Sequence, residues 1–133
     1  MQKLSLQALA REQQTVAATA SSGRSARTVF GGHEHVLRQT VIALTAGSSL
    51  SEHDNLGDAT ILVLSGRVRL TAGQVNWEGR QGDLLLIPSS RNSLLALEDA
   101  AILLSAAAKP AKAGSSQEQR SREPEPAAST GTA

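Results

Sequence analysis

The histidines are the side chains of this sequence best suited to chemistry near neutral pH, because imidazole can act as an acid, a base or a metal ligand. His33 and His35 stand two positions apart in the run GGHEH. On a β-strand this spacing places both imidazoles on one face, as a pair of metal ligands requires. The simpler interpretation, which we favour, is that both are solvated residues after a turn at Gly31–Gly32, since two histidines alone are a weak motif.

Arg38 and Gln39 are polar residues inside the apolar strand pattern Leu37–Leu44. Adjacent side chains of a strand point to opposite faces, so only one of the two can face an interior. An inward guanidinium or amide would bind an anionic or polar ligand. The alternative, which we favour, is an edge-strand residue that reaches water.

Thiolate and nucleophilic chemistry is not predicted. The absence of cysteine excludes disulfides, thiolate metal sites and cysteine nucleophiles. Ser89, Ser90 and Ser93 have no base partner that the sequence identifies. The chain also has neither a GxSxG motif nor a phosphate-binding glycine loop.

The composition is typical of one small domain. With 133 residues, 40% of them hydrophobic, the chain can form one modest core. A net charge of +1 and an aromatic share of 2% give no reason to expect nucleic acid or a membrane as a partner. No apolar run approaches the roughly 20 residues of a membrane helix, and Met1–Ala10 lacks the form of a signal peptide. We therefore expect a soluble protein of the cytoplasm.

Three regions differ in composition and predict the domain organisation. Residues 1–28 are predicted as an N-terminal helix and linker, with Ser5 as the helix cap and Thr19–Arg27 as the linker. Residues 29–107 carry the fold. Residues 108–133 contain three of the four prolines and no large apolar residue, so we expect a disordered tail.

The central region contains short apolar runs separated by turn residues, as in an all-β sandwich or barrel. The predicted strands are Leu37–Leu44, Thr60–Leu64, Arg67–Thr71, Val75–Glu78, Asp83–Ile87, Ser93–Leu97 and Ala101–Ser105. Arg67–Thr71 alternates cleanly and is predicted to form a hairpin with Val75–Glu78 that has one wet face.

Three segments are apolar on both faces, namely Val41–Leu44, Ile61–Leu64 and Leu84–Ile87. Strands of this kind are covered on both sides. The outer cover is either the N-terminal helix or a second subunit, and we expect a homodimer. Trp77, the only tryptophan, is expected to pack in a core or a dimer contact rather than to stack on a ligand.

The stretch 47–66, GSSLSEHDNLGDATILVLSG, resembles the first motif of the cupin superfamily, in which two histidines and a glutamate stand between two glycines. Gly47, His53 and Gly66 match this motif. Asn55 stands in place of the second histidine, and Ala59 stands in place of the glutamate.

The stretch 82–97, GDLLLIPSSRNSLLAL, resembles the second cupin motif. Gly82 and Pro88 match at the expected spacing. Ser93 stands where the third histidine is usual, and Asn92 beside it is not a histidine either.

This resemblance implies a cupin double-stranded β-helix, which is a jelly-roll barrel, with a cavity at its mouth. Candidate ligand-binding residues at the mouth are His53, Asn55 and Ser93 from the motifs, and Gln39 and Arg38 from the strand pattern. An apolar interior lined by Ala59, Ile61, Val63 and Leu95 follows from alternation along the strands.

The metal site that the resemblance implies is degenerate. One imidazole, at His53, and two neutral oxygens, at Asn55 and Ser93, are a poor set of transition-metal ligands, so no cofactor is expected. The alternative is a divalent metal at His53 joined by His33 or His35. His53 itself is either a ligand-contacting residue or a polar residue of the rim.

Three functions follow as hypotheses. The first is a non-catalytic protein that binds an unknown small molecule or serves as an accessory protein. The second is a metal-dependent oxygenase or isomerase with an unusual site around His53. The third is a dimeric structural or interaction barrel without a ligand.

Overall fold

A computed structural model gives the structure of the chain, and it describes residues 1–53, 57–88 and 90–107. The elements along the chain are α1 (Leu6–Thr19), β1 (Arg24–Phe30), β2 (Leu37–Leu44), β3 (Ser49–His53), β4 (Asp58–Ser65), β5 (Arg67–Ala72), β6 (Val75–Arg80), β7 (Leu84–Leu86), β8 (Asn92–Ala96) and β9 (Ala100–Ala107). No helix among these residues is long and apolar enough to cross a lipid bilayer.

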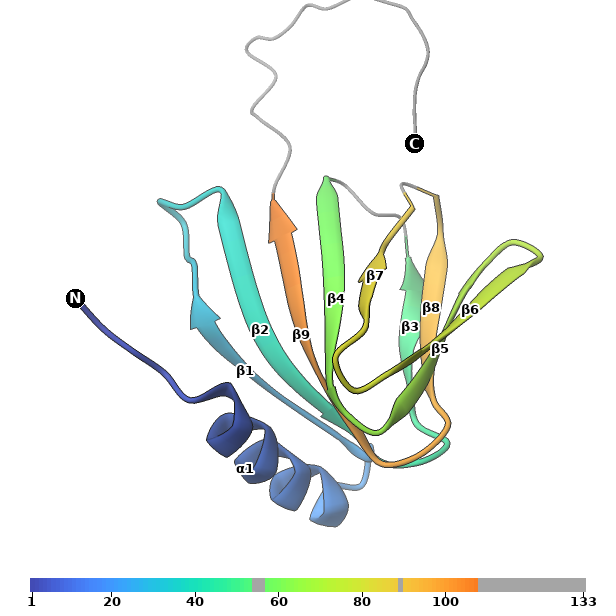
Figure 1. Ribbon diagram of the computed structural model, residues 1–133, viewed down its shortest axis with the longest axis horizontal. Helices are drawn as coiled ribbons and strands as arrows, with labels where there is room; N and C mark the ends of the chain where they lie inside the picture. Colours follow the sequence, from blue (N-terminus) through green and yellow to red (C-terminus); the bar gives the residue numbers. More distant parts are fainter. Residues whose placement is uncertain (54–56, 89, 108–133) are drawn as a thin grey trace, which may run out of the picture.

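The strands form two antiparallel sheets that face each other (Figure 1). We call the five-stranded sheet, in the order β1-β2-β9-β4-β7, sheet A, and the four-stranded sheet, in the order β3-β8-β5-β6, sheet B. One end of this barrel contains the last residues of β7 and β9, the first residues of β4 and β8, and the turn between β5 and β6 (Figure 1). We call this end the mouth.

The core lies between the two sheets, and alternation along the strands builds it. In β2 and β4 the side chains of Leu44 and Val63 point inward, and in β5 and β9 those of Leu70 and Ile102 do the same. All four are almost fully buried. Because successive side chains of a strand point to opposite faces, the outer faces of the same strands must be covered or polar.

Helix α1 covers part of the outer face of sheet A, where it contacts β1, β2, β9 and β4 (Figure 1). The Ser5 hydroxyl caps the helix by accepting a hydrogen bond from the Ala8 N–H at 3.2 Å. Leu9 and Ala17 are buried on the face toward the sheet. Gln13, which interrupts the apolar stripe, accepts a hydrogen bond from the Ser25 hydroxyl of β1.

The predicted N-terminal helix and all seven predicted strands are present. The linker predicted for Thr19–Arg27 is wrong from Arg24 onward, where β1 begins. Neither β1 nor β3 is predicted from the sequence. Both are edge strands, and β1 is mostly exposed, so neither carries the apolar alternation of a core strand. The predicted disordered tail, 108–133, lies outside the described residues.

Candidate ligand site at the barrel mouth

Ala59 lies on the inner face of sheet A near the mouth, where the cupin motif would carry a glutamate. It shares this face with Ile61 and Val63, which are buried in the core two and four positions further along β4. The predicted interior role of these three residues agrees with this placement. A methyl group at this position offers no metal ligand.

The inner residue of β8 at the mouth is Asn92, and not Ser93 as the motif alignment suggests. Asn92, Leu94 and Ala96 are the buried residues of this strand. Ser93 and Leu95 point to the outer face of sheet B, since alternation sets them opposite to Leu94. The expectations that Ser93 faces the mouth and that Leu95 lines the interior are therefore wrong.

Asn92 is only 8% exposed, and it is the one buried polar residue in the described part of the chain. Its side-chain amide donates a hydrogen bond to the Ser90 carbonyl oxygen at 3.0 Å. This bond joins the start of β8 to the segment that precedes it. A buried amide requires such a partner, because an unsatisfied polar group costs about 1–3 kcal/mol.

His53 is the last residue of β3, and its backbone lies opposite Asn92 in the register between β3 and β8. A register shift separates this pair from Leu50, which pairs with Leu94. Asn55, the second candidate from the first motif, lies outside the described residues. The backbone thus brings the one matching histidine of the first motif next to the start of β8.

A hollow of about 220 Å³ opens at the mouth. It is lined by Leu70, Ala72, Val75, Trp77, Pro88 and Ser90. In the β5–β6 hairpin, Leu70 pairs with Trp77 and Ala72 pairs with Val75, so all four side chains share one face of the ribbon. Apolar surface on two strands of sheet B, together with the segment after β7, forms the walls.

Trp77 is a residue of this hollow, so the first of its two expected roles, packing in a core, is wrong, while the second, a dimer contact, stays a prediction. Its side chain is 48% exposed. It lies on β6, which is the edge strand of sheet B. The alternation of Val75 and Trp77 was the sequence feature that marked this face, but alternation alone does not tell how far the opposite sheet reaches.

Gln39 does not lie at the mouth interior. It occupies the outer face of β2, and its amide donates a hydrogen bond to the Ser105 hydroxyl at 3.0 Å. It also lines a second hollow, of about 460 Å³, on the outer face of sheet A. The other residues of that hollow are Gln2, Leu4, Leu6, Val29, Phe30 and Leu103.

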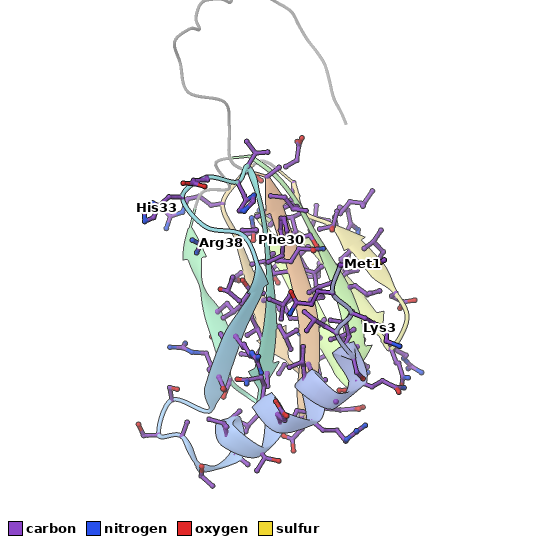
Figure 2. All side chains as sticks on the ribbon, turned by 90° about the vertical axis from the view of Figure 1, so that its left-hand side faces the viewer. Met1, Lys3, Phe30, His33 and Arg38 are labelled. Carbon is purple, nitrogen blue, oxygen red and sulfur yellow. The ribbon has the colours of Figure 1, made fainter. Side chains whose placement is uncertain are left out.

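Arg38 occupies the opposite face of β2 from Gln39, at a position in line with Ile42 and Leu44 of the core. In the register it pairs with Ala106 of β9. Its side chain is exposed, and no hydrogen bond or ion pair joins it to another described residue. Figure 2 shows Arg38 on the same side of the molecule as His33 and the β1–β2 loop.

His33 and His35 lie in the loop between β1 and β2, and both are exposed. They are not on a strand, so the period-two argument for a shared face does not apply to them. The ring of His35 lies against that of Phe30, with 4.9 Å between the ring centroids. The solvated loop that we favoured from the sequence matches this arrangement.

The residues described at the mouth do not fit a transition metal ion. Ala59 has no donor atom, and the Asn92 amide is neutral and already engaged with the Ser90 carbonyl. In the described part of the chain, no three His, Cys, Asp or Glu side chains come close enough together to hold an ion. We therefore derive no metal-dependent step for this site.

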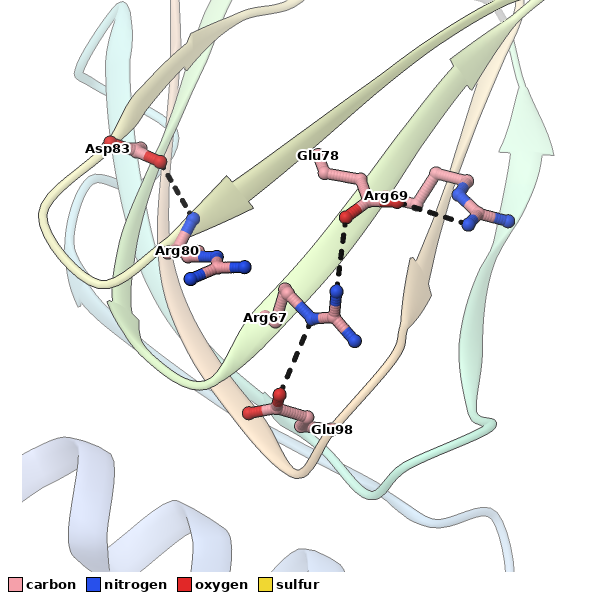
Figure 3. Close-up of polar contacts among 6 residues, drawn as sticks. All are labelled: Arg67, Arg69, Glu78, Arg80, Asp83 and Glu98. Carbon is pink, nitrogen blue, oxygen red and sulfur yellow. Dashed lines mark hydrogen bonds and ion pairs between the residues drawn. The ribbon is translucent and has the colours of Figure 1, made fainter.

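The outer face of sheet B near the hairpin is charged (Figure 3). Glu78 of β6 pairs with Arg67 at 3.3 Å and with Arg69 at 3.2 Å. Arg67 also pairs with Glu98 at 3.4 Å. These partly exposed pairs form the wet face that the alternation of β5 predicts, and each contributes little to stability.

No protein-family model matches the chain, and no curated protein matches it by sequence. Solved structures do match. A conserved protein of unknown function from Streptococcus pyogenes is 26% identical, with a TM-score of 0.62 over 69% of this chain and 80% of that protein. A cupin superfamily protein from Desulfitobacterium hafniense is 16% identical, with a TM-score of 0.60 over 65% of this chain and 78% of that one. A cupin 2 conserved barrel domain protein from Salinispora arenicola is 16% identical, with a TM-score of 0.55 over 64% and 76%.

Proposed function

We propose that the chain, which has the fold of cupin proteins, is a non-catalytic protein that binds a small molecule at the barrel mouth without a transition metal ion. Fold alone does not identify a function, so the proposal depends on the mouth itself.

The hollow of about 220 Å³ is the observation that carries the proposal. Small-molecule sites are concave, mostly apolar and supplied with a few polar groups. Five of the six lining residues are apolar, and Ser90 supplies polar atoms at the edge. Trp77 contributes a large, half-exposed ring, which is costly to leave in water without a partner.

The loss of metal ligands supports a binding role over a metal-dependent one. Ala59 and Asn92 occupy the inner face where a carboxylate and an imidazole would be needed. The competing hypothesis is an oxygenase or isomerase that uses His53 with His33 or His35. It requires the β1–β2 loop to bring an imidazole to the end of β3.

The two hypotheses differ in metal content and in ligand response. The full chain, purified without chelators, is analysed for bound metal and then screened by thermal shift against a broad panel of metabolites and divalent ions. We expect metal far below one ion per chain. We also expect at least one organic molecule to raise the melting temperature in a saturable manner.

Two histidine variants complete this experiment. His53→Ala and His35→Ala are compared for metal content, and we expect no difference between them and the parent chain. Stoichiometric metal that is lost in His53→Ala would establish the metal-dependent alternative, and its loss in His35→Ala as well would identify the second imidazole. A panel in which no metabolite stabilises the chain would contradict the proposed binding role.

A second candidate role is self-association, and the outer face of β7 favours it. Leu84 and Leu86 are 56% and 65% exposed and lie beyond the part of sheet A that α1 contacts. Their register partners on β4 are Leu62 and Thr60, which are also uncharged. A second copy can cover this face without bringing like charges together, as a symmetric interface requires.

A further inference from the structure

The lining of the mouth hollow is electrically neutral. Among the described residues, the hollow meets five apolar side chains and one serine, and none of them is charged. Its polar side-chain groups are the Ser90 hydroxyl and the indole N–H of Trp77, and the Ser90 carbonyl already accepts a hydrogen bond from the Asn92 amide. A ligand in this hollow therefore finds apolar contact over most of its surface.

The charged groups of the same hairpin are turned away from the hollow. Val75 and Trp77 point into it, while Glu78 points to the other face of β6. There its carboxylate lies between the guanidinium groups of Arg67 and Arg69 (Figure 3). Together with Glu98, which pairs with Arg67, the two guanidinium groups and two carboxylates balance one another outside the hollow and do not line it.

Arg38, an exposed cation on the inner face of β2, is not part of the lining. Arg38 stands on β2, which the order of sheet A separates from β4 by β9. No residue of β2 is among those that line the hollow. Figure 2 shows the Arg38 side chain beside the β1–β2 loop and His33.

We infer that the mouth hollow selects a small, neutral, largely apolar molecule that lies against the Trp77 ring and presents a hydroxyl or amide group to Ser90. This inference rests on the proposed binding function and adds the chemical class of the ligand. The volume of about 220 Å³ lies below the roughly 300–1,000 Å³ of drug-sized sites, so the ligand is of fragment size. A charged ligand would lose water without gaining a partner charge.

Trp77 is a built-in reporter for this test. The chain has one tryptophan and no tyrosine, so emission excited near 295 nm comes from Trp77 alone. Benzyl alcohol, benzoate and benzylamine have nearly the same size but are neutral, anionic and cationic at pH 7. We expect benzyl alcohol to change the emission saturably, with a dissociation constant at least about tenfold lower than those of the two ions.

Two variants of β6 locate the effect. Val75→Asp places a carboxylate in the lining, and we expect at least a tenfold loss of benzyl alcohol affinity. Asn76→Asp adds the same charge on the opposite face of the strand, and we expect no change. Val75 is half exposed and Asn76 is exposed, so we expect both variants to fold.

Each outcome decides between the ligand class and the site. Equal affinity for the neutral probe and either ion overturns the neutral class but leaves the binding function in place. Equal losses of benzyl alcohol affinity in Val75→Asp and Asn76→Asp overturn the placement of the ligand. An absence of saturable response to all three probes overturns the inference, and a metabolite panel without any ligand would then overturn the proposed function as well.

Discussion

Leu70 and Trp77 are paired across the β5–β6 hairpin on the same face, yet Leu70 is 1% exposed and Trp77 is 48% exposed. The difference follows from the strand order of sheet B: β5 lies between β8 and β6, whereas β6 is the edge strand, so the leucine has a neighbouring strand on both sides and the indole on one side only. One strand pair therefore contributes both a core residue and a residue of the candidate site.

This contrast predicts different stability effects for two truncations. Leu70→Ala leaves a cavity in the core and is expected to lower the free energy of unfolding by about 2–5 kcal/mol. Trp77→Ala is expected to lower it by about 2 kcal/mol, at the low end of that range, because half of the residue is already in water. Urea unfolding followed by far-UV circular dichroism measures both. A loss of unfolding free energy in Trp77→Ala that is larger than the loss in Leu70→Ala would mean that the ring is a core residue after all.

Much of the fold was predictable because the core strands have strong sequence patterns. The bounds of β2 are those that the run Leu37–Leu44 predicts, and β5 and β6 form the predicted hairpin. The edge strand β1 was not predictable in the same way. Its sequence is mostly polar, and it exists because it pairs with β2 and lies next to α1.

The candidate site was harder to predict because a shift of one residue reverses a strand's faces. The motif alignment selects Ser93, but the strand turns Asn92 inward instead. Trp77 could be assigned to the apolar face of its hairpin, but not to the uncovered end. Which part of a face is covered depends on the opposite sheet, and no local pattern contains that information.

The turn between β4 and β5 predicts a severe effect for one glycine substitution. Gly66 has a φ of +78°, and a Cβ there would lie 2.2 Å from the Asp99 carbonyl oxygen. Gly73 has a φ of +60° but no atom within 4 Å of its Cβ position. Gly73→Ala is expected to cost about 1–2 kcal/mol from backbone strain alone. Gly66→Ala must also displace the start of β9, so we expect urea unfolding to show a clearly larger loss of unfolding free energy than in Gly73→Ala. Equal losses in the two variants would argue against the clash.

The inward position of Asn92 predicts how a metal site can be introduced. Ala59→Glu combined with Asn92→His adds a carboxylate and an imidazole to the inner face near the end of β3. We expect this double variant to bind Zn²⁺ at least about tenfold more tightly than the parent chain, because carboxylate and imidazole are suitable ligands. Isothermal titration calorimetry measures the difference.

A matched variant tests the assignment of the two faces of β8. Ala59→Glu combined with Ser93→His adds the same groups but places the imidazole on the outer face of sheet B. We expect no gain in Zn²⁺ affinity over Ala59→Glu alone. A gain equal to that of the Asn92→His combination would show that the motif alignment, and not the burial of Asn92, identifies the inward residue.

The exposed leucines of β7 predict a self-association that charge can disrupt. We expect light scattering coupled to size exclusion to give twice the mass of the chain at micromolar concentration. The variant Leu84→Glu with Leu86→Glu is expected to be monomeric, because like charges would meet in a symmetric contact. Its far-UV circular dichroism is expected to be unchanged, because both side chains are largely in water within one chain. Gln74→Glu with Gln81→Glu adds the same charge at exposed turns and is expected to remain dimeric.

A parent chain that stays monomeric at all concentrations refutes self-association. A leucine variant that stays dimeric moves the contact to another face, for which the second hollow, around Phe30 and Leu103, is the next surface to test.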